Sequence, residues 1–139
     1  MAALNIFDIA GSGMNAQNLR LNLVASNLAN ANSISSSSGT VYKSRQPVFG
    51  AELKNVIDAQ NGASKVEIRG IVESKAPPIV EYNPNHPMAD KDGYIFKSNV
   101  NTVEEMANMM AASRSYQNNI EVLNTAKQMM LQTLRIGQQ

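Results

Sequence analysis

The chain has 139 residues, which favours one compact domain or a small domain with long appendages. A net charge of +1 without clustered Lys and Arg excludes a binder that tracks nucleic-acid phosphates, and the lack of cysteine excludes disulfides and Cys-based zinc sites. Eight methionines, with only 5% aromatic residues, favour adaptable apolar contacts.

Targeting and membrane signals are missing from the residue pattern. The first residues carry no basic stretch followed by an apolar one, and no run of about 20 apolar residues occurs in the chain. We therefore expect a soluble chain with no cleaved secretion signal and no membrane-spanning segment.

A long helix is predicted over residues 6–31, because apolar residues recur there every three or four positions. Only Asp8 and Arg20 are charged in this span, and amides supply most of the remaining polarity. A helix without a charged solvent face is suited to contact with further protein. Gly11 and Gly13 either loosen its first turns or allow another backbone to come close.

The segment after this helix is predicted to be a polar loop over residues 32–40, because serine dominates it. Short extended segments are expected on either side of Pro47, over residues 41–46 and 48–49. Asn61-Gly62 indicates a further turn.

Two more extended segments are predicted before the chain turns helical again. Residues 66–69 alternate at period two until Gly70, which indicates a bulge or a strand end. The prolines at 77, 78, 84 and 87 exclude a helix or a central strand in this region. Asp92-Gly93 predicts a turn into a strand over residues 94–97.

The last helix is predicted over residues 103–136, where apolar residues again recur every three or four positions. Its start shows a capping-box pattern, formed either by Thr102 with Glu105 or, one residue earlier, by Asn101 with Glu104.

These elements predict a mainly α fold, with long N- and C-terminal helices that pack as a coiled-coil-like pair and a small, β-leaning, loop-rich middle. Four segments are expected: an N-terminal helix segment over 1–32, a Ser- and Gly-containing loop and linker over 33–63, a β-leaning segment over 64–98, and a C-terminal helix segment over 99–139. Within the last segment, Gly137 is expected to end the helix.

Helices of this length are not expected to be stable alone. Each buried large apolar side chain yields about 1.5–3 kcal/mol, whereas ordering the backbone costs about 1–2 kcal/mol for every residue. We therefore expect both ends to be largely unfolded or frayed in the free monomer and to fold on assembly. Full helicity and cooperative melting of the dilute chain, measured by circular dichroism, would contradict this.

No group of residues in the sequence supports catalysis. His86, near Asp90 and Asp92, lacks the second positioned group that acid–base chemistry needs and the closing Glu that a calcium loop needs. Glu104 and Glu105 are neighbours on a helix and face different directions, and the serines at 35–38 have no phosphate-loop spacing. We predict a protein that is not an enzyme, without cofactor, metal or small-molecule substrate.

Several motifs together resemble a known family. Ile9-Ala-Gly-Ser-Gly-Met14 and the Leu-Asn-Leu-Val-Ala-Ser-Asn-Leu-Ala-Asn-Ala-Asn at residues 21–32 resemble the signature of bacterial flagellar axial proteins, which form rod and hook. Asn-Pro-Asn-His-Pro-Met-Ala-Asp at 83–90 and Ser-Arg-Ser-Tyr-Gln at 113–117 are more selective and resemble the proximal-rod branch. The Ser-rich continuation after Ala31 also resembles this branch, and replaces the Thr-Pro-Gly-Tyr-like turn of the general signature.

The resemblance implies a structural subunit of the flagellar basal-body rod, the drive shaft that crosses the periplasm. Family members are exported unfolded through the flagellar type III apparatus, and their terminal helices pack into a tube around a central channel. The implied partners are copies of the chain, other rod proteins, the basal-body ring and rod-base adaptor proteins, and the export apparatus.

In such a tube, Leu21, Val24 and Leu28 would pack against Ile120, Leu123 and Met130, within or between subunits. The full predicted assembly interface is Met14, Leu21, Val24, Leu28, Met106, Met110, Tyr116, Ile120, Leu123, Met130 and Leu134. The alternative is a soluble partner-binding module, such as a flagellar secretion chaperone or adaptor. A chaperone would usually be acidic with a sizeable folded core, and neither holds for this composition.

Overall fold

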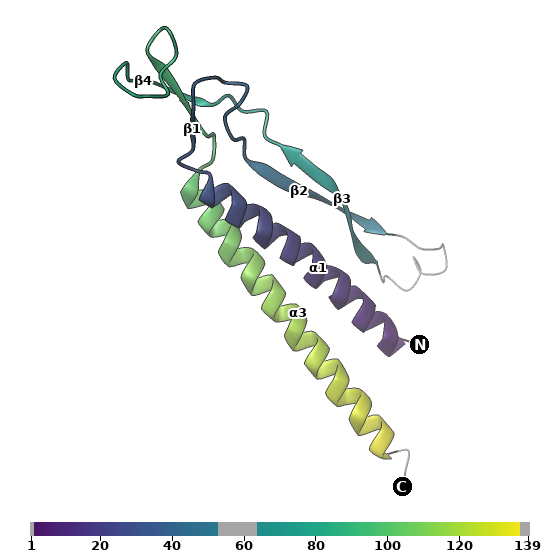
Figure 1. The fold of residues 1–139 in the computed structure, drawn as a ribbon. Coiled ribbons are helices and arrows are strands. Elements are labelled where there is room, and N and C mark those ends of the chain that lie inside the picture. The colour runs from purple at the N-terminus through teal and green to yellow at the C-terminus, as the bar shows by residue number, and fades with distance from the viewer. Residues whose placement is uncertain (1, 53–63, 137–139) are drawn as a thin grey trace. The chain divides into compact units, whose positions relative to one another are not determined.

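The computed structural model describes residues 2–52 and 64–136. Its elements in chain order are α1 (Ala2–Ala29), β1 (Ile34–Ser35), β2 (Arg45–Glu52), β3 (Lys65–Glu73), β4 (Ile79–Tyr82), β5 (Tyr94–Lys97) and α3 (Thr102–Ile136) (Figure 1). The two long terminal helices and the small antiparallel sheet between them in sequence confirm these parts of the predicted architecture, and coiled-coil-like packing of the helices stays a prediction.

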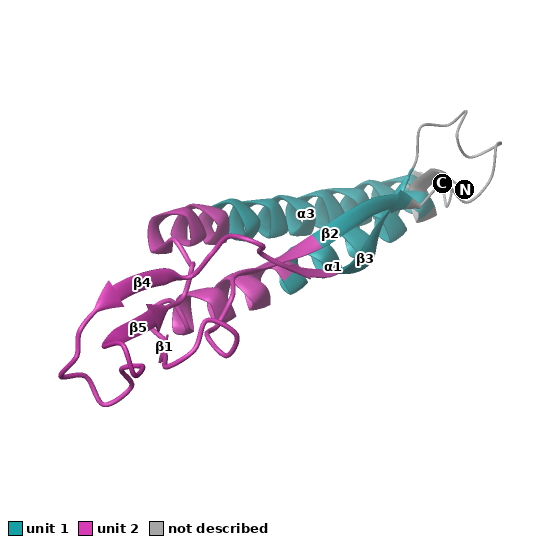
Figure 2. Ribbon diagram, turned by 90° about the horizontal axis from the view of Figure 1, so that it is seen from above, with its two compact units in different colours: residues 1–19, 48–70, 111–139 teal, residues 20–47, 71–110 magenta. Residues whose placement is uncertain are grey.

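The chain folds into two compact units, coloured separately in Figure 2. Unit 1 comprises residues 1–19, 48–70 and 111–139, and unit 2 comprises residues 20–47 and 71–110. Each unit therefore combines a stretch of α1 with a stretch of α3. The four consecutive segments expected from the sequence stay a prediction.

In unit 1, residues 48–52 of β2 and residues 65–70 of β3 run beside the first half of α1 (Figure 1). The Lys65 ammonium lies 2.8 Å from the Asp8 carboxylate, and the Val66 amide donates a 3.1 Å hydrogen bond to Ser12 Oγ. Among helix residues 5–19 and 111–135 of this unit, the buried apolar side chains are alanines, at Ala10, Ala16, Ala112 and Ala126. Small side chains let neighbouring backbones approach closely.

The two early glycines of α1 have different surroundings. A Cβ added to Gly13 would lie 2.9 Å from Nδ2 of Asn119, whereas one added to Gly11 would meet nothing within 4 Å. The close neighbour of Gly13 is therefore a side chain of α3 and not another backbone.

We expect Gly11→Ala to raise the free energy of unfolding by up to about 1 kcal/mol, because alanine is the better helix former. Gly13→Ala should gain less or lose stability, since the Asn119 amide must move. Urea unfolding of both variants, followed by circular dichroism, measures the difference. Equal gains would show that Asn119 exerts no constraint on this position.

In unit 2, β1, β5 and β4 form an antiparallel sheet in that order. Ile95 of β5 is 1% exposed and anchors this sheet. β4 lies at the edge between the flanking prolines, so the exclusion of a central strand is confirmed. Gly93 has φ +82°, and an added Cβ there would lie 2.9 Å from Cε2 of Tyr82, which explains why glycine precedes β5 in the predicted turn.

Strand boundaries differ from the predicted ones in two places. β2 is one strand that passes through Pro47, and it begins only at Arg45. At its start, asparagine side chains take the place of a strand partner. The backbone N–H of Ser44 donates to Asn99 Oδ1 at 2.8 Å, and the backbone N–H of Arg45 donates to Asn27 Oδ1 at 3.0 Å. β3 continues past Gly70 to Glu73, so a strand end at Gly70 is wrong.

The Ser-rich loop is confirmed except that Ile34–Ser35 form β1. Its serines hold the turn themselves, because Ser35 Oγ hydrogen-bonds to Thr40 Oγ1 and Gly39 N donates to Ser37 Oγ at 3.3 Å. The predicted turn at Asn61-Gly62 and the predicted helix stop at Gly137 lie outside the described residues.

The start of α3 distinguishes the two predicted capping boxes. Asn101 Oδ1 accepts hydrogen bonds from the amides of Val103 at 3.1 Å and Glu104 at 3.4 Å, so Asn101 is the N-cap. Glu105 is 4% exposed, and its carboxylate accepts from Ser44 Oγ at 3.5 Å. The box of Thr102 with Glu105 is therefore wrong, because the Glu105 side chain is used in tertiary packing. α1 runs from Ala2 to Ala29, earlier at both ends than predicted.

We expect Asn101→Ala to lower the free energy of unfolding by about 1 kcal/mol, the usual cost of removing an N-cap side chain. Thr102→Ala, one residue later, should change it by no more than a few tenths of a kcal/mol. Chemical denaturation of the two variants provides the comparison. A larger loss from Thr102→Ala than from Asn101→Ala would reverse the assignment of the cap.

Candidate assembly surface

The face of α3 that is covered within the chain repeats every three and four residues. Its fully buried members are Glu105, Ala112 and Ala126, at 4%, 0% and 7% exposure. The three-four repeat on this face is Glu105, Met109, Ala112, Tyr116, Asn119, Leu123, Ala126 and Met130, and Asn108, Ser113 and Ser115 beside it are also half-buried. Small and polar groups therefore make the tightest contacts of α3 within the chain.

Most large apolar side chains of α3 point away from that face. Val103 is 75% exposed, Met110 65% and Leu134 63%. The others are Met106, Ile120, Val122, Met129 and Leu131. Single exposed apolar residues are normal on a protein surface, but a helix with most of its large apolar side chains in water is typical of an unfilled interface.

The predicted interface residues divide into three groups by exposure. Val24 is buried at 4% exposure. The half-buried residues are Met14, Leu21, Leu28, Tyr116, Leu123 and Met130. The exposed residues are Met106, Met110, Ile120 and Leu134.

Sequence reasoning left four exposed apolar residues of α3 out of the interface: Val103, Val122, Met129 and Leu131. The last three lie off the three-four spacing that the predicted interface residues of α3 follow. The sequence does contain a signal for these residues. They are large and apolar, and they lie at helix positions outside the stripe that would face a core.

The proposed partners of Leu21, Val24 and Leu28 lie in the other unit, since Ile120, Leu123 and Met130 belong to unit 1. Their pairing stays a prediction.

Within unit 2, Arg20 of α1 donates a 2.8 Å hydrogen bond from Nη2 to Oδ1 of Asn108 of α3. This bond joins the second half of α1 to the start of α3, as expected for helices that run in opposite directions.

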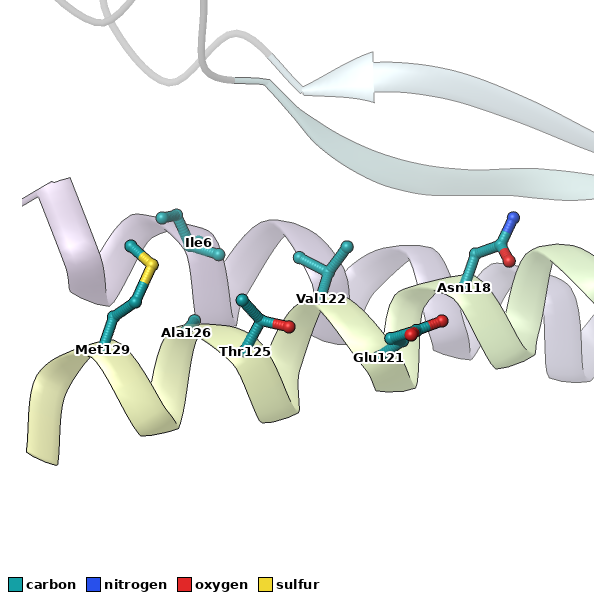
Figure 3. Close-up of a pocket in the computed structure, with 7 residues that line it drawn as sticks. All are labelled: Ile6, Asn118, Glu121, Val122, Thr125, Ala126 and Met129. Carbon is teal, nitrogen blue, oxygen red and sulfur yellow. The ribbon is translucent and has the colours of Figure 1, made fainter.

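Unit 1 contains a groove of about 550 Å³ between the start of α1 and the far part of α3. Ile6 of α1 and Val122 and Met129 of α3 project toward the same space (Figure 3). The other lining residues are Asn118, Glu121, Thr125 and Ala126. An apolar groove with a single carboxylate at its edge is suited to side chains of another protein segment.

Asn27 is the centre of a buried polar network in unit 2 and is 0% exposed. Its Nδ2 donates to the Arg45 carbonyl at 2.9 Å and to Ser44 Oγ at 3.4 Å. Its Oδ1 accepts from the Tyr42 hydroxyl at 2.8 Å and from the Arg45 amide at 3.0 Å. The amides of α1 were expected to face further protein, but this one is satisfied inside the chain and fixes the segment that leads into β2.

The groups considered for chemistry have structural explanations. His86 Nδ1 accepts a 3.1 Å hydrogen bond from the Met88 amide, which stabilises its own loop. The Ser-rich loop lines a polar cleft of about 490 Å³ in unit 2. Among the described residues, no three His, Asp or Glu side chains cluster so that they could hold a metal ion. Of the helices described, none is long and apolar enough to cross a membrane.

Two family models match the chain at its ends. Residues 7–33 match a model described as flagella basal body rod protein. Residues 91–136 match one described as flagellar basal body rod FlgEFG protein C-terminal. These two stretches contain most of the helices described above.

Relatives match over the whole length. A flagellar basal-body rod protein FlgC of Salmonella typhimurium strain LT2 is 51% identical, covering 99% of this chain and 100% of the relative. The FlgC proteins of Buchnera aphidicola subsp. Acyrthosiphon pisum and Yersinia enterocolitica are 47% and 46% identical, with the same coverage. Identity at this level over full-length chains means that the chain belongs to the FlgC family of flagellar basal-body rod proteins, and is a structural component of that rod and not an enzyme.

Proposed function

We propose that the chain assembles through its terminal helices into the torque-transmitting drive shaft of the flagellum and lines its export channel. The observation that carries this proposal is the exposure of most of the large apolar side chains of α3, from Val103 to Leu134. Covering apolar area with a neighbouring subunit yields about 25 cal/mol for each Å² removed from water. Many such contacts along a helix share a mechanical load.

The covered face of α3 supports coiled-coil-like pairing with α1, because its three-four repeat is the spacing of knobs-into-holes packing. In this proposal the helical segments 1–32 and 99–139 form the tube wall, and the segments 33–63 and 64–98 face outward.

The proposed partners are copies of the chain, other rod proteins, the basal-body ring and rod-base adaptor proteins, and the type III export apparatus. The expected fraying of free helix ends also belongs to this proposal. In α3, residues 131–135 are exposed after the half-buried Met130, so fraying should begin there.

A density map of the intact basal body tests the proposal. We expect α1 and α3 to be traceable in the rod wall, with the exposed apolar face of α3 against neighbouring subunits. A map in which this face borders the water-filled channel along its length would overturn the proposed assembly mode. No comparison supports the chaperone or adaptor alternative, which predicts that the purified chain stops at a dimer as concentration rises.

A further inference from the structure

Unit 1 carries two different apolar surfaces on opposite sides of α3. One is the groove, in which Val122 and Met129 contribute side chains from α3. The other, called here the ridge, is the exposed stripe Ile120, Asn124, Lys127, Leu131 and Leu134. Residues two apart in a helix point about 200° away from each other. Ile120 and Val122 are two apart, as are Met129 and Leu131, so the ridge faces away from the groove.

Each surface contains one charged side chain, and the two side chains have opposite charge. Glu121 lines the groove, and Lys127 lies within the ridge. Neither side chain takes part in an ion pair or hydrogen bond within residues 2–52 and 64–136. They are six positions apart, which places them about 120° apart around the helix. They are therefore poorly placed to pair within one chain.

We propose that the groove of one copy receives the ridge of a second copy, with Glu121 of one subunit facing Lys127 of the next. This inference rests on the proposed self-assembly and names the two surfaces that meet. A groove against a groove would bring two Glu121 carboxylates together, and a ridge against a ridge would bring two Lys127 ammonium groups together. Charge repulsion disfavours both, whereas the mixed contact pairs opposite charges.

The geometry of the mixed contact also explains how an assembly could grow by adding copies. The two surfaces differ and lie on opposite sides of α3, so a copy that uses its groove still presents its ridge to the next copy. Contacts of this head-to-tail kind produce rings or open helical assemblies instead of closed dimers.

The chain has no cysteine, so introduced cysteines report contacts without background. Two differently tagged full-length chains, one with Val122→Cys and one with Leu131→Cys, are expressed together and their isolated basal bodies are oxidised. A disulfide needs Cβ atoms about 3.5–4.5 Å apart. We expect a mixed dimer carrying both tags. Replacing the first variant by Ile71→Cys, on exposed β3, should abolish it.

Basal bodies that contain both variants but yield only same-position dimers, or no dimer, would overturn the inference and leave the proposed function standing. Absence of the unsubstituted tagged chain from isolated basal bodies would overturn the proposed function, and the inference with it.

Charge reversal adds a second readout. Glu121→Lys or Lys127→Glu in both tagged chains should cause loss of the mixed dimer, and the two reversals combined should restore it. A combined variant without recovery would also count against the inference.

Discussion

Asn27→Leu is expected to lower the free energy of unfolding by about 3–5 kcal/mol. The substitution keeps the number and branching of the side-chain heavy atoms but removes the hydrogen bonds of Asn27. The Arg45 amide and the Arg45 carbonyl lose this partner, and the Tyr42 hydroxyl keeps its contact with Ser26 Oγ. Each buried polar group that loses its partner costs about 1–3 kcal/mol. Small domains are stable by only about 5–15 kcal/mol, so this loss should unfold much of unit 2 near physiological temperature.

Urea unfolding followed by circular dichroism measures this loss. The matched control is Asn15→Leu, at an exposed position of α1, which should change the free energy of unfolding by less than about 0.5 kcal/mol. Asn27→Asp keeps the accepting oxygen, but it puts a second acceptor opposite the Arg45 carbonyl and a charge at a fully buried position. It should therefore also lose far more stability than the control. If Asn27→Leu and Asn15→Leu lose the same stability, the network does not hold unit 2 together.

The second large effect separates folding from assembly. We expect Ile120→Asp to leave the helicity of the free chain equal to that of the unsubstituted chain and to block its incorporation into the rod, while its export stays measurable. Ile120 is 38% exposed, so a carboxylate there remains hydrated in the free chain and becomes buried only against a neighbour. Motility and detection of the tagged chain in basal bodies report incorporation, and the secreted fraction reports export.

Val24→Asp is the informative counterpart. Both residues were predicted to be interface positions, but Val24 is 4% exposed within the chain. A carboxylate there is buried in the folded chain itself, so stability should fall by several kcal/mol and incorporation should be lost through unfolding. Val80→Asp, at an exposed position of β4, controls for the charge alone and should leave motility normal. Normal motility from Ile120→Asp would remove Ile120 from the interface.

Local patterns predicted most of the fold. The three-four spacing of apolar residues predicted both long helices, and Asp92-Gly93 predicted the turn into β5, since these signals depend on neighbours along the chain. The errors lie where a distant partner intervened. Glu105 looked like half of a capping box, but its carboxylate packs beside Ser44. Residues 41–44 looked extended, but Asn27 and Asn99 bind the backbone at 44 and 45.

The candidate surface was predictable in kind and not in detail. Apolar periodicity treats every residue of a stripe alike, so it selected Val24 and Ile120 together although one is buried and the other is exposed. Among the described residues of α3, the fully buried apolar side chains are alanines, and most of the larger apolar side chains stay exposed. A helical stripe cannot reveal which of its neighbours belongs to the same chain.

By itself, the sequence predicted two long, charge-poor terminal helices, and its motifs carried the resemblance to the flagellar rod that full-length relatives confirm. Only the tertiary structure decided which face of each helix is covered, that Asn27 is satisfied within the chain, and that α3 presents a groove and a ridge on opposite sides. The physical reason is that helix formation depends on residues a few positions apart. Burial depends on segments that lie far apart along the chain and come together only in the fold.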